Sequence, residues 1–367
     1  MNRRDFIGTG LAMMGAAVIA GCTDDAAQDN KDNQSGGAFP SYDIPRYSDW
    51  IPEESHNSEA TGVYFTHVDW ESLDGLESES EDEVEDDEAA DVIRQIPILG
   101  LPLYGALISP LTLFGIAFYP FAGDLLTEDG ESAEGIKTTT LTWVDDLLIF
   151  HGEYDIDTFD AQYTDGFTNT EAQAGFTIYV GNEAATEGLA YALSEEALIV
   201  GMTPGETEEY ESEQLITDAL TRYTKENDRV VDTEDGQWLF ETTGQAQMAF
   251  GSWETEDLMA ALDTGSAENG SMHAGDGTSE TELDDEANPV FDCVESVVNT
   301  ISYSVDNGEM TDIEARFAGI YPEGSVPSEE EVREHLIGEA DVPHEIIIDE
   351  THVHATATFE DEPGALA

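Results

Sequence analysis

Residues 297–320 read Val-Val-Asn-Thr-Ile-Ser-Tyr-Ser-Val-Asp-Asn-Gly-Glu-Met-Thr-Asp-Ile-Glu-Ala-Arg-Phe-Ala-Gly-Ile, two largely apolar runs around an Asp-Asn-Gly turn. This pattern is typical of a β-hairpin. A two-residue loop would set Ile301 opposite Glu314, whereas a three-residue loop with Gly308 in the left-handed conformation pairs Ile301 with Ile313. The sequence therefore predicts the three-residue loop, because apolar side chains of both strands then share one face.

The segment beyond the hairpin contains a helix with a defined start. Glu331 follows Ser328 by three residues, which is the spacing of a capping box, so a helix is predicted over residues 328–337. Two further strands are predicted over residues 344–349 and 352–359, and in the second of them apolar residues alternate with polar ones.

The chain before the hairpin shows the same order of elements. Two passes of a β-α-β-β-α unit predict an α+β fold of two tandem ferredoxin-like repeats with antiparallel sheets. The first repeat would span residues 41–230, with a first strand at 62–70, and the second would span 231–360 after a polar connector at 226–236. Residues 361–367 are expected to be a disordered tail. The predicted strands are 147–154, 175–180 and 198–202, then 246–253, 297–305 and 310–320, and the predicted helices are 157–163 and 212–225, then 256–262 and 328–337.

An uncharged segment interrupts the first repeat. Residues 95–123 carry four prolines among Leu, Ile, Phe and Tyr and follow an acidic run at 77–91. The length would permit a membrane span, but prolines divide the segment into short pieces. We expect an apolar helical insertion that caps a sheet. The alternatives are an exposed arm that contacts a membrane or a partner, and a true membrane span.

The charge balance is extreme. The chain of 367 residues has 82 acidic and 11 basic residues, a formal net charge of −71, yet 40% of its residues are hydrophobic. Such a chain can build a core only if its self-repulsion is screened, as in concentrated salt. A nucleic-acid partner is excluded, because binding to phosphates needs a basic surface.

The first 22 residues have the pattern of an export signal. Arg3 and Arg4 precede a short uncharged run, and Ile-Ala-Gly leads into Cys22. The run is shorter than the roughly 20 residues that a spanning helix needs. We therefore expect a twin-arginine signal peptide over residues 1–21 and a flexible tether over 22–40, with lipid attached to the Cys22 thiol.

This signal together with the acidic composition resembles the twin-arginine-exported lipoproteins of extremely halophilic archaea. The resemblance implies a protein on the cell surface, anchored to the outer face of the cytoplasmic membrane through its lipid. It covers the signal region and the composition, and it names no activity.

The best candidate metal ligands are His352 and His354. Alternate residues of a strand point the same way, so two outward-facing imidazoles would converge, and zinc would need a third ligand that the sequence does not place. His67 and His151 lie inside apolar strands and are expected to be core or edge residues. With Cys22 assigned to lipid, Cys293 has no partner and is expected to be a buried small side chain.

No catalytic residue is assigned. The sequence lacks a nucleophile elbow, a His-Glu-x-x-His motif and a phosphate-binding loop, and with 82 acidic residues paired carboxylates carry no information. The favoured function is a non-catalytic binding or structural accessory protein on the cell surface, whose ligand is unidentified. The alternatives are a secreted metal-assisted enzyme that uses His352 and His354, and a solute receptor linked to a transporter.

Overall fold

The fold is described from a computed structural model. It describes the following parts of the chain: residues 38–55, 62–73, 96–103, 119–125, 135–170, 172–183, 186–201, 212–225, 228–255, 288–306, 309–338 and 342–359.

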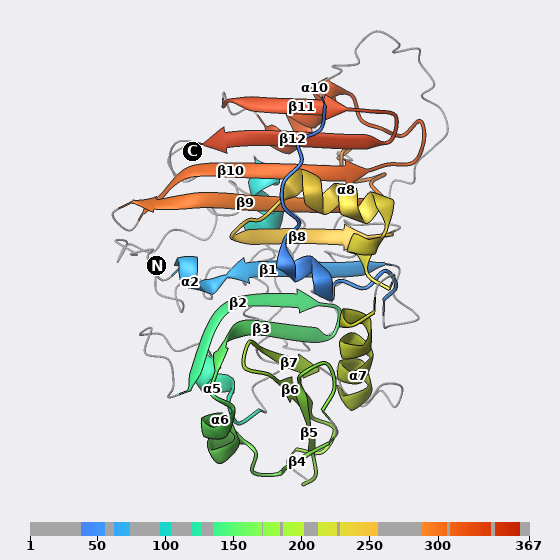
Figure 1. The fold of residues 1–367 in the computed structure, drawn as a ribbon. Helices are drawn as coiled ribbons and strands as arrows, with labels where there is room; N and C mark the ends of the chain where they lie inside the picture. Colours follow the sequence, from blue (N-terminus) through green and yellow to red (C-terminus); the bar gives the residue numbers. More distant parts are fainter. Residues whose placement is uncertain are drawn as a thin grey trace, which may run out of the picture.

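The described strands form one antiparallel sheet. Twelve strands lie in the order β11-β12-β10-β9-β8-β1-β2-β3-β7-β6-β5-β4 (Figure 1). The predicted pair of ferredoxin-like repeats is therefore wrong, since the two halves share a single sheet. The strands are β1 (Val63–Asp69), β2 (Ile136–Val144), β3 (Leu147–Tyr154), β4 (Phe167–Asn169), β5 (Thr177–Gly181), β6 (Ala190–Leu193), β7 (Ala197–Gly201), β8 (Met248–Trp253), β9 (Ser296–Asp306), β10 (Glu309–Ile320), β11 (His344–Ile348) and β12 (His352–Phe359).

The two halves join where β1 and β8 pair. Phe65 lies opposite Gly251 in this ladder. A Cβ atom on Gly251 would lie 2.3 Å from the ring of Phe65, so the absent side chain leaves room for the aromatic ring. Long-range pairing of this kind decides the architecture, and no local sequence pattern encodes it.

The two halves of the sheet have corresponding strand orders. Outward from the centre, β1-β2-β3-β7-β6 mirrors β8-β9-β10-β12-β11. A short helix follows the third strand in each half, and both of these helices pack into the same core cluster. The order of strands therefore repeats from β1 and from β8, whereas the first repeat was predicted from a strand at residue 147.

Helices cover both faces of the sheet. The front face, toward the viewer in Figure 1, carries η2, α7 and α8, and the rear face carries α6, α10, η5 and residues 97–103. The described helices are η2 (Arg46–Trp50), α2 (Trp70–Leu73), α5 (Ala122–Leu125), α6 (Ile156–Tyr163), α7 (Ser212–Tyr223), η4 (Val230–Asp232), α8 (Glu234–Thr243), α10 (Glu329–Val332) and η5 (Arg333–Ile337). The capping box of Ser328 and Glu331 is confirmed at α10.

The β9–β10 hairpin has a different register from the predicted one. Near the turn Val305 pairs with Met310, and beyond it Ile301 pairs with Ala315 rather than with Ile313. A β-bulge between Thr311 and Glu314 adds the extra residue, and Asp312 has a φ of 49° there. The apolar faces still match, because the bulge and not the loop corrects the alternation.

The described ends of the apolar segment 95–123 lie in the rear core. Residues 97–103 are helical, and Ile98, Leu99 and Phe121 have no exposed surface. These parts pack with the rear side chains of the sheet in one cluster. No helix among the residues described here combines the length and apolar character that crossing a membrane requires.

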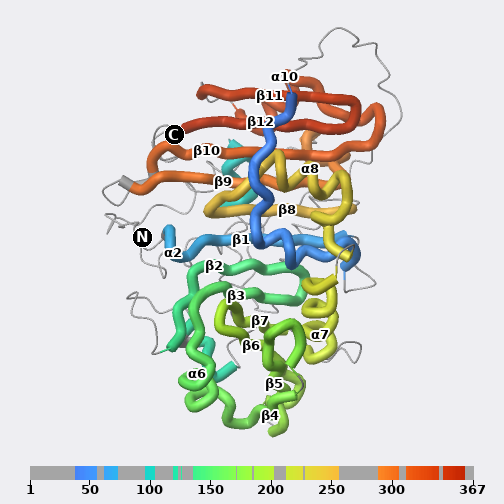
Figure 2. The backbone as a smooth tube through the Cα atoms, viewed as in Figure 1, coloured from blue at the N-terminus to red at the C-terminus, as the bar shows by residue number. Residues whose placement is uncertain are grey.

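The described N-terminal segment, residues 38–45, packs against the front face of the sheet. It runs over the second half of the sheet before it reaches η2 (Figure 2). The Tyr42 N–H donates to the Glu241 carbonyl oxygen at 2.7 Å, and the Arg316 guanidinium lies 4.2 Å from the Tyr42 ring centroid. Phe39 meets the edge of Trp238 at 5.2 Å between ring centroids. These contacts fix the path by which the chain enters η2.

Candidate aromatic pocket

A pocket opens on the front of the first half, between η2, α7 and the strands β3, β5 and β7. Its volume is about 470 Å³. Its walls come from segments distant in sequence: Trp50, His151, Ile156, Ala174, Gly175, Phe176, Thr177, Leu193, Ser194, Glu195, Glu196, Ala197 and Tyr223.

Trp50 organises the floor of this pocket. Its ring stacks on Tyr223 with centroids 4.3 Å apart and planes 9° apart, and Phe176 meets it edge-on at 6.2 Å. The Trp50 indole N–H donates to His151 Nε2 at 3.2 Å. Trp50 is 7% exposed while Tyr223 is 38% exposed, so the buried indole supports a tyrosine ring that solvent reaches.

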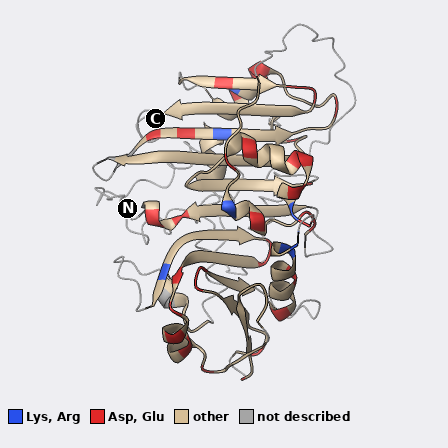
Figure 3. Cartoon of the chain, viewed as in Figure 1, with Lys and Arg blue, Asp and Glu red and all other residues tan. Residues whose placement is uncertain are grey.

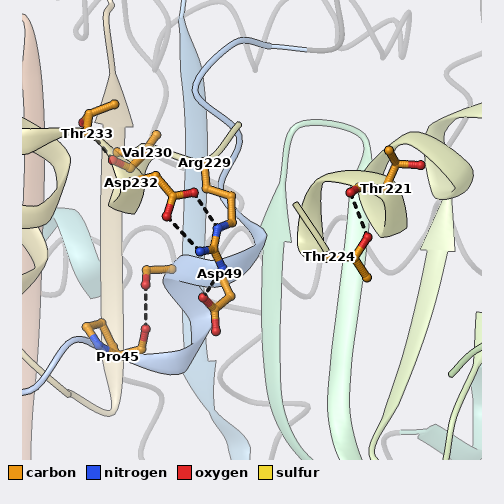
Figure 4. Close-up of polar contacts among 9 residues, drawn as sticks. Pro45, Asp49, Thr221, Thr224, Arg229, Val230, Asp232 and Thr233 are labelled. Carbon is orange, nitrogen blue, oxygen red and sulfur yellow. Dashed lines mark hydrogen bonds and ion pairs between the residues drawn. The ribbon is translucent and has the colours of Figure 1, made fainter. Parts of the chain in front are cut away.

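Arg229 holds η2 and its Trp50 in place (Figure 4). Its guanidinium donates to Asp49 Oδ1 at 2.6 Å and to both carboxylate oxygens of Asp232 at 2.8 Å. The Ser48 hydroxyl donates to the Pro45 carbonyl at the start of the helix. Burial raises the pKa of Asp49, and Arg229 opposes that shift. The clamp joins η2 to η4 and fixes the position of the pocket floor.

His151 is neutral and has a defined tautomer. Burial, with a further effect of Arg46, lowers the pKa of His151 to about 4. Because Nε2 accepts the hydrogen bond from Trp50, the ring proton resides on Nδ1. His151 therefore lines the pocket as a neutral ring whose hydrogen lies on Nδ1.

A second cavity adjoins the first. Its volume is about 720 Å³, and it shares Ile156 and Glu195 with the aromatic pocket. Lys137, which lines it, forms an exposed ion pair of 2.9 Å with Glu71. The lining residues are Gly135, Ile136, Lys137, Glu153, Tyr154, Asp155, Ile156, Asp157 and Glu195. We call the two cavities together the lateral groove.

The predicted metal ligands lie at the other end of the sheet. His352 and His354 share the front face of β12, as alternation requires, but His354 is only 1% exposed, so the expectation that both point to solvent is wrong for His354. Its Nε2 lies 3.2 Å from the Thr356 hydroxyl, and His352 Nε2 lies 3.8 Å from Asp235. The described residues include no group of three His, Cys, Asp or Glu side chains placed to hold a metal ion.

The cysteine assignments have different outcomes. Cys293 is disulfide-bonded, so the expectation that it has no partner is wrong. Arg3, Arg4 and Cys22 lie outside the described residues.

The pocket residues were not predicted as a site. His67 and His151 were expected to be ordinary core or edge residues, and this holds for His67, which is 4% exposed, stacks on Tyr47 at 4.4 Å and contacts the Thr142 hydroxyl at 2.9 Å. Tyr223 was placed on the apolar face of its helix. Nothing in the sequence spacing connects it to Trp50, so the sequence carried no signal for this site.

The fold and the pocket define a class: an antiparallel single-sheet protein with an aromatic pocket at one side. No family model matches the chain, and neither the curated proteins nor the solved structures provide a match.

Proposed function

We propose that this chain is an exported, membrane-anchored surface lipoprotein that binds an organic solute without transforming it. The observation that supports the proposal is the pocket of about 470 Å³ with its stacked Trp50–Tyr223 floor. Small-molecule sites are usually concave, rich in aromatic side chains and supplied with a few placed polar groups. The Arg229 clamp holds the floor before any ligand arrives, which lowers the ordering cost of binding.

The lining indicates the kind of ligand. The exposed ring of Tyr223 offers a flat surface, and His151 lines the pocket as a neutral ring. Glu195 and Glu196 line the pocket, and acidic positions outnumber basic ones in the described parts of the chain (Figure 3). In concentrated salt their attraction for a cation is screened within about 3 Å, so the proposed recognition rests on ring contacts and hydrogen bonds.

Phenol tests the pocket directly, because it has a flat ring and one hydroxyl. We expect saturation-transfer NMR in about 2 M KCl to detect binding with a Kd of about 1 mM, or about −4 kcal/mol. The variant Thr177→Trp places an indole in the pocket wall and should abolish the signal. Thr358→Trp, on β12 at the far end of the sheet, is the matched control. Equal saturation transfer in both variants would overturn the proposal.

The anchoring part rests on Arg3, Arg4 and Cys22. It requires a Cys22 thiol that is free to take the lipid, because a sulfur joined to lipid cannot also form a disulfide. Mass spectrometry of the mature N-terminal peptide decides the matter. The proposal predicts a diacylglyceryl adduct on Cys22 and release of the protein from membranes in Cys22→Ser. A peptide without lipid contradicts the anchor and leaves the pocket unaffected.

A further inference from the structure

The aromatic pocket adjoins a larger space. Ile156 and Glu195 belong to the walls of both cavities, so the cavities of about 470 and 720 Å³ lie side by side along the lateral groove. A compact solute would occupy the aromatic end alone. An elongated molecule could pass Ile156 and Glu195 and occupy both cavities, from Tyr223 to Lys137.

We infer that the ligand is a neutral oligosaccharide, with one sugar ring stacked on Tyr223 and the following rings lying along the groove. This inference rests on the proposed binding function and specifies its ligand class. A pyranose presents an apolar C–H face that packs on an aromatic ring. The Trp50 ring stacked behind Tyr223 holds the tyrosine ring in a fixed orientation.

The remainder of the groove provides acceptors for hydroxyl groups. Glu153, Asp157 and Glu195 are exposed at its walls, and a carboxylate accepts hydrogen bonds through both oxygens. Lys137 is engaged with Glu71. Sugar hydroxyls match this lining, and they need no net attraction of charge, which concentrated salt would weaken.

A peptide strand fits the groove less well. Extended peptides usually gain affinity from main-chain hydrogen bonds to an open strand edge. The groove crosses the ends of β2 and β3 and the turn between β6 and β7, and each of these strands is paired on both sides. The groove therefore offers side chains rather than a free strand edge.

Chain length is the variable that tests the inference. The probes are cellohexaose, maltohexaose and laminarihexaose with their disaccharides, measured by saturation-transfer NMR in about 2 M KCl. We expect one hexasaccharide to bind at least about 10-fold more tightly than its disaccharide, which corresponds to 1.4 kcal/mol. Tyr223→Ala should weaken the binding of this hexasaccharide and of its disaccharide. Asp157→Trp, at the far end of the groove, should reduce the affinity of the hexasaccharide to that of the disaccharide, and Glu330→Trp on α10 should change neither.

The outcomes separate the two proposals. If phenol binds and none of the three hexasaccharides does, the glycan assignment is overturned and the pocket remains. If neither phenol nor a glycan binds, both proposals are overturned. Binding of an alternating Lys-Trp hexapeptide in place of every glycan would also overturn the assignment, since it would show a basic peptide as the preferred occupant.

Discussion

At the scale of single residues, burial decides the protonation of the histidines. Burial lowers the pKa of His67 to about 3 and that of His354 to about 4, with smaller effects of His151 and Arg316 respectively. Both side chains are at most 4% exposed. Each histidine is therefore neutral in the folded protein at pH values where the unfolded chain, with a pKa near 6.5, begins to bind protons.

The folded protein should therefore lose stability as the pH falls from 7 to about 5.5. When folding lowers the pKa of a histidine, the resulting stabilisation is complete at pH values above its unfolded pKa of about 6.5. It is lost progressively as the pH falls toward the folded pKa. Each of these two histidines should cost about 1 kcal/mol over this interval. Urea melts in concentrated KCl should show that His354→Gln removes about 1 kcal/mol of this pH dependence.

The control is His344→Gln, on the exposed edge strand β11. This variant should keep the loss of stability that is attributed to His354. If His354→Gln also keeps the full pH dependence, the assignment of a buried neutral His354 is wrong.

Gly251 is the residue on which the central strand pair depends. An added Cβ would meet the Phe65 ring at 2.3 Å and the Val297 carbonyl oxygen at 2.8 Å. We expect Gly251→Ala to lower the free energy of unfolding by about 3 kcal/mol, and the added change Phe65→Leu to recover part of that loss. Chemical denaturation measures both effects.

Gly324→Ala provides the comparison, because its φ is +87° but nothing lies within 4 Å of the added Cβ. It should cost about 1 kcal/mol, from backbone strain alone. Equal losses for the two alanine variants would contradict the close approach of β1 and β8.

At the scale of elements, the strands with apolar and β-branched residues could be predicted from the sequence. Residues 147–154 coincide with β3, and the hairpin strands and β12 were also found. β2 was missed because its first half, Lys137-Thr-Thr-Thr140, is polar. α8 was missed because Gly236 sits in its first turn, where a Cβ would lie 2.0 Å from the Val230 carbonyl oxygen.

Neither the pairing of the strands nor the aromatic pocket could be predicted from the sequence, and the reason is the same for both. β1 meets β8 across about half the chain, and Trp50 meets Tyr223 through the fold alone. The expected register of Ile301 with Ile313 failed because a bulge can restore facial alternation as well as a longer loop can. Local periodicity identifies strands and their faces, and long-range contacts decide the rest.

The Arg229 clamp is the element-scale test of the pocket. Arg229→Met keeps the apolar stem and removes the hydrogen bonds to Asp49 and Asp232. We expect a loss of about 2 kcal/mol in the free energy of unfolding and weaker phenol binding, because η2 no longer holds Trp50. Arg333→Met, at an exposed position of η5, should change neither quantity. Unchanged phenol affinity in Arg229→Met would show that the hydrogen bonds of Arg229 do not hold the pocket in its binding conformation.

At the scale of the whole molecule, charge opposes the compact state. A formal net charge of −71 with 11 basic residues leaves few ion pairs to offset repulsion, and the cartoon in Figure 3 shows more acidic than basic positions on the described helices and strands. We expect the fold to be lost when the salt is lowered from molar KCl to a few tens of millimolar, because the screening length then grows from about 3 Å to more than 10 Å. Circular dichroism during dialysis measures this. An unchanged spectrum in dilute buffer would contradict the expectation.

We propose that the pocket beside Trp50 is a ligand site, and a crystal structure of the protein soaked with phenol in concentrated salt shows whether it is one. We expect a phenol ring inside the pocket, among Tyr223, Phe176 and Thr177. A soaked crystal in which this pocket holds no phenol, while phenol is bound elsewhere on the protein, would contradict it.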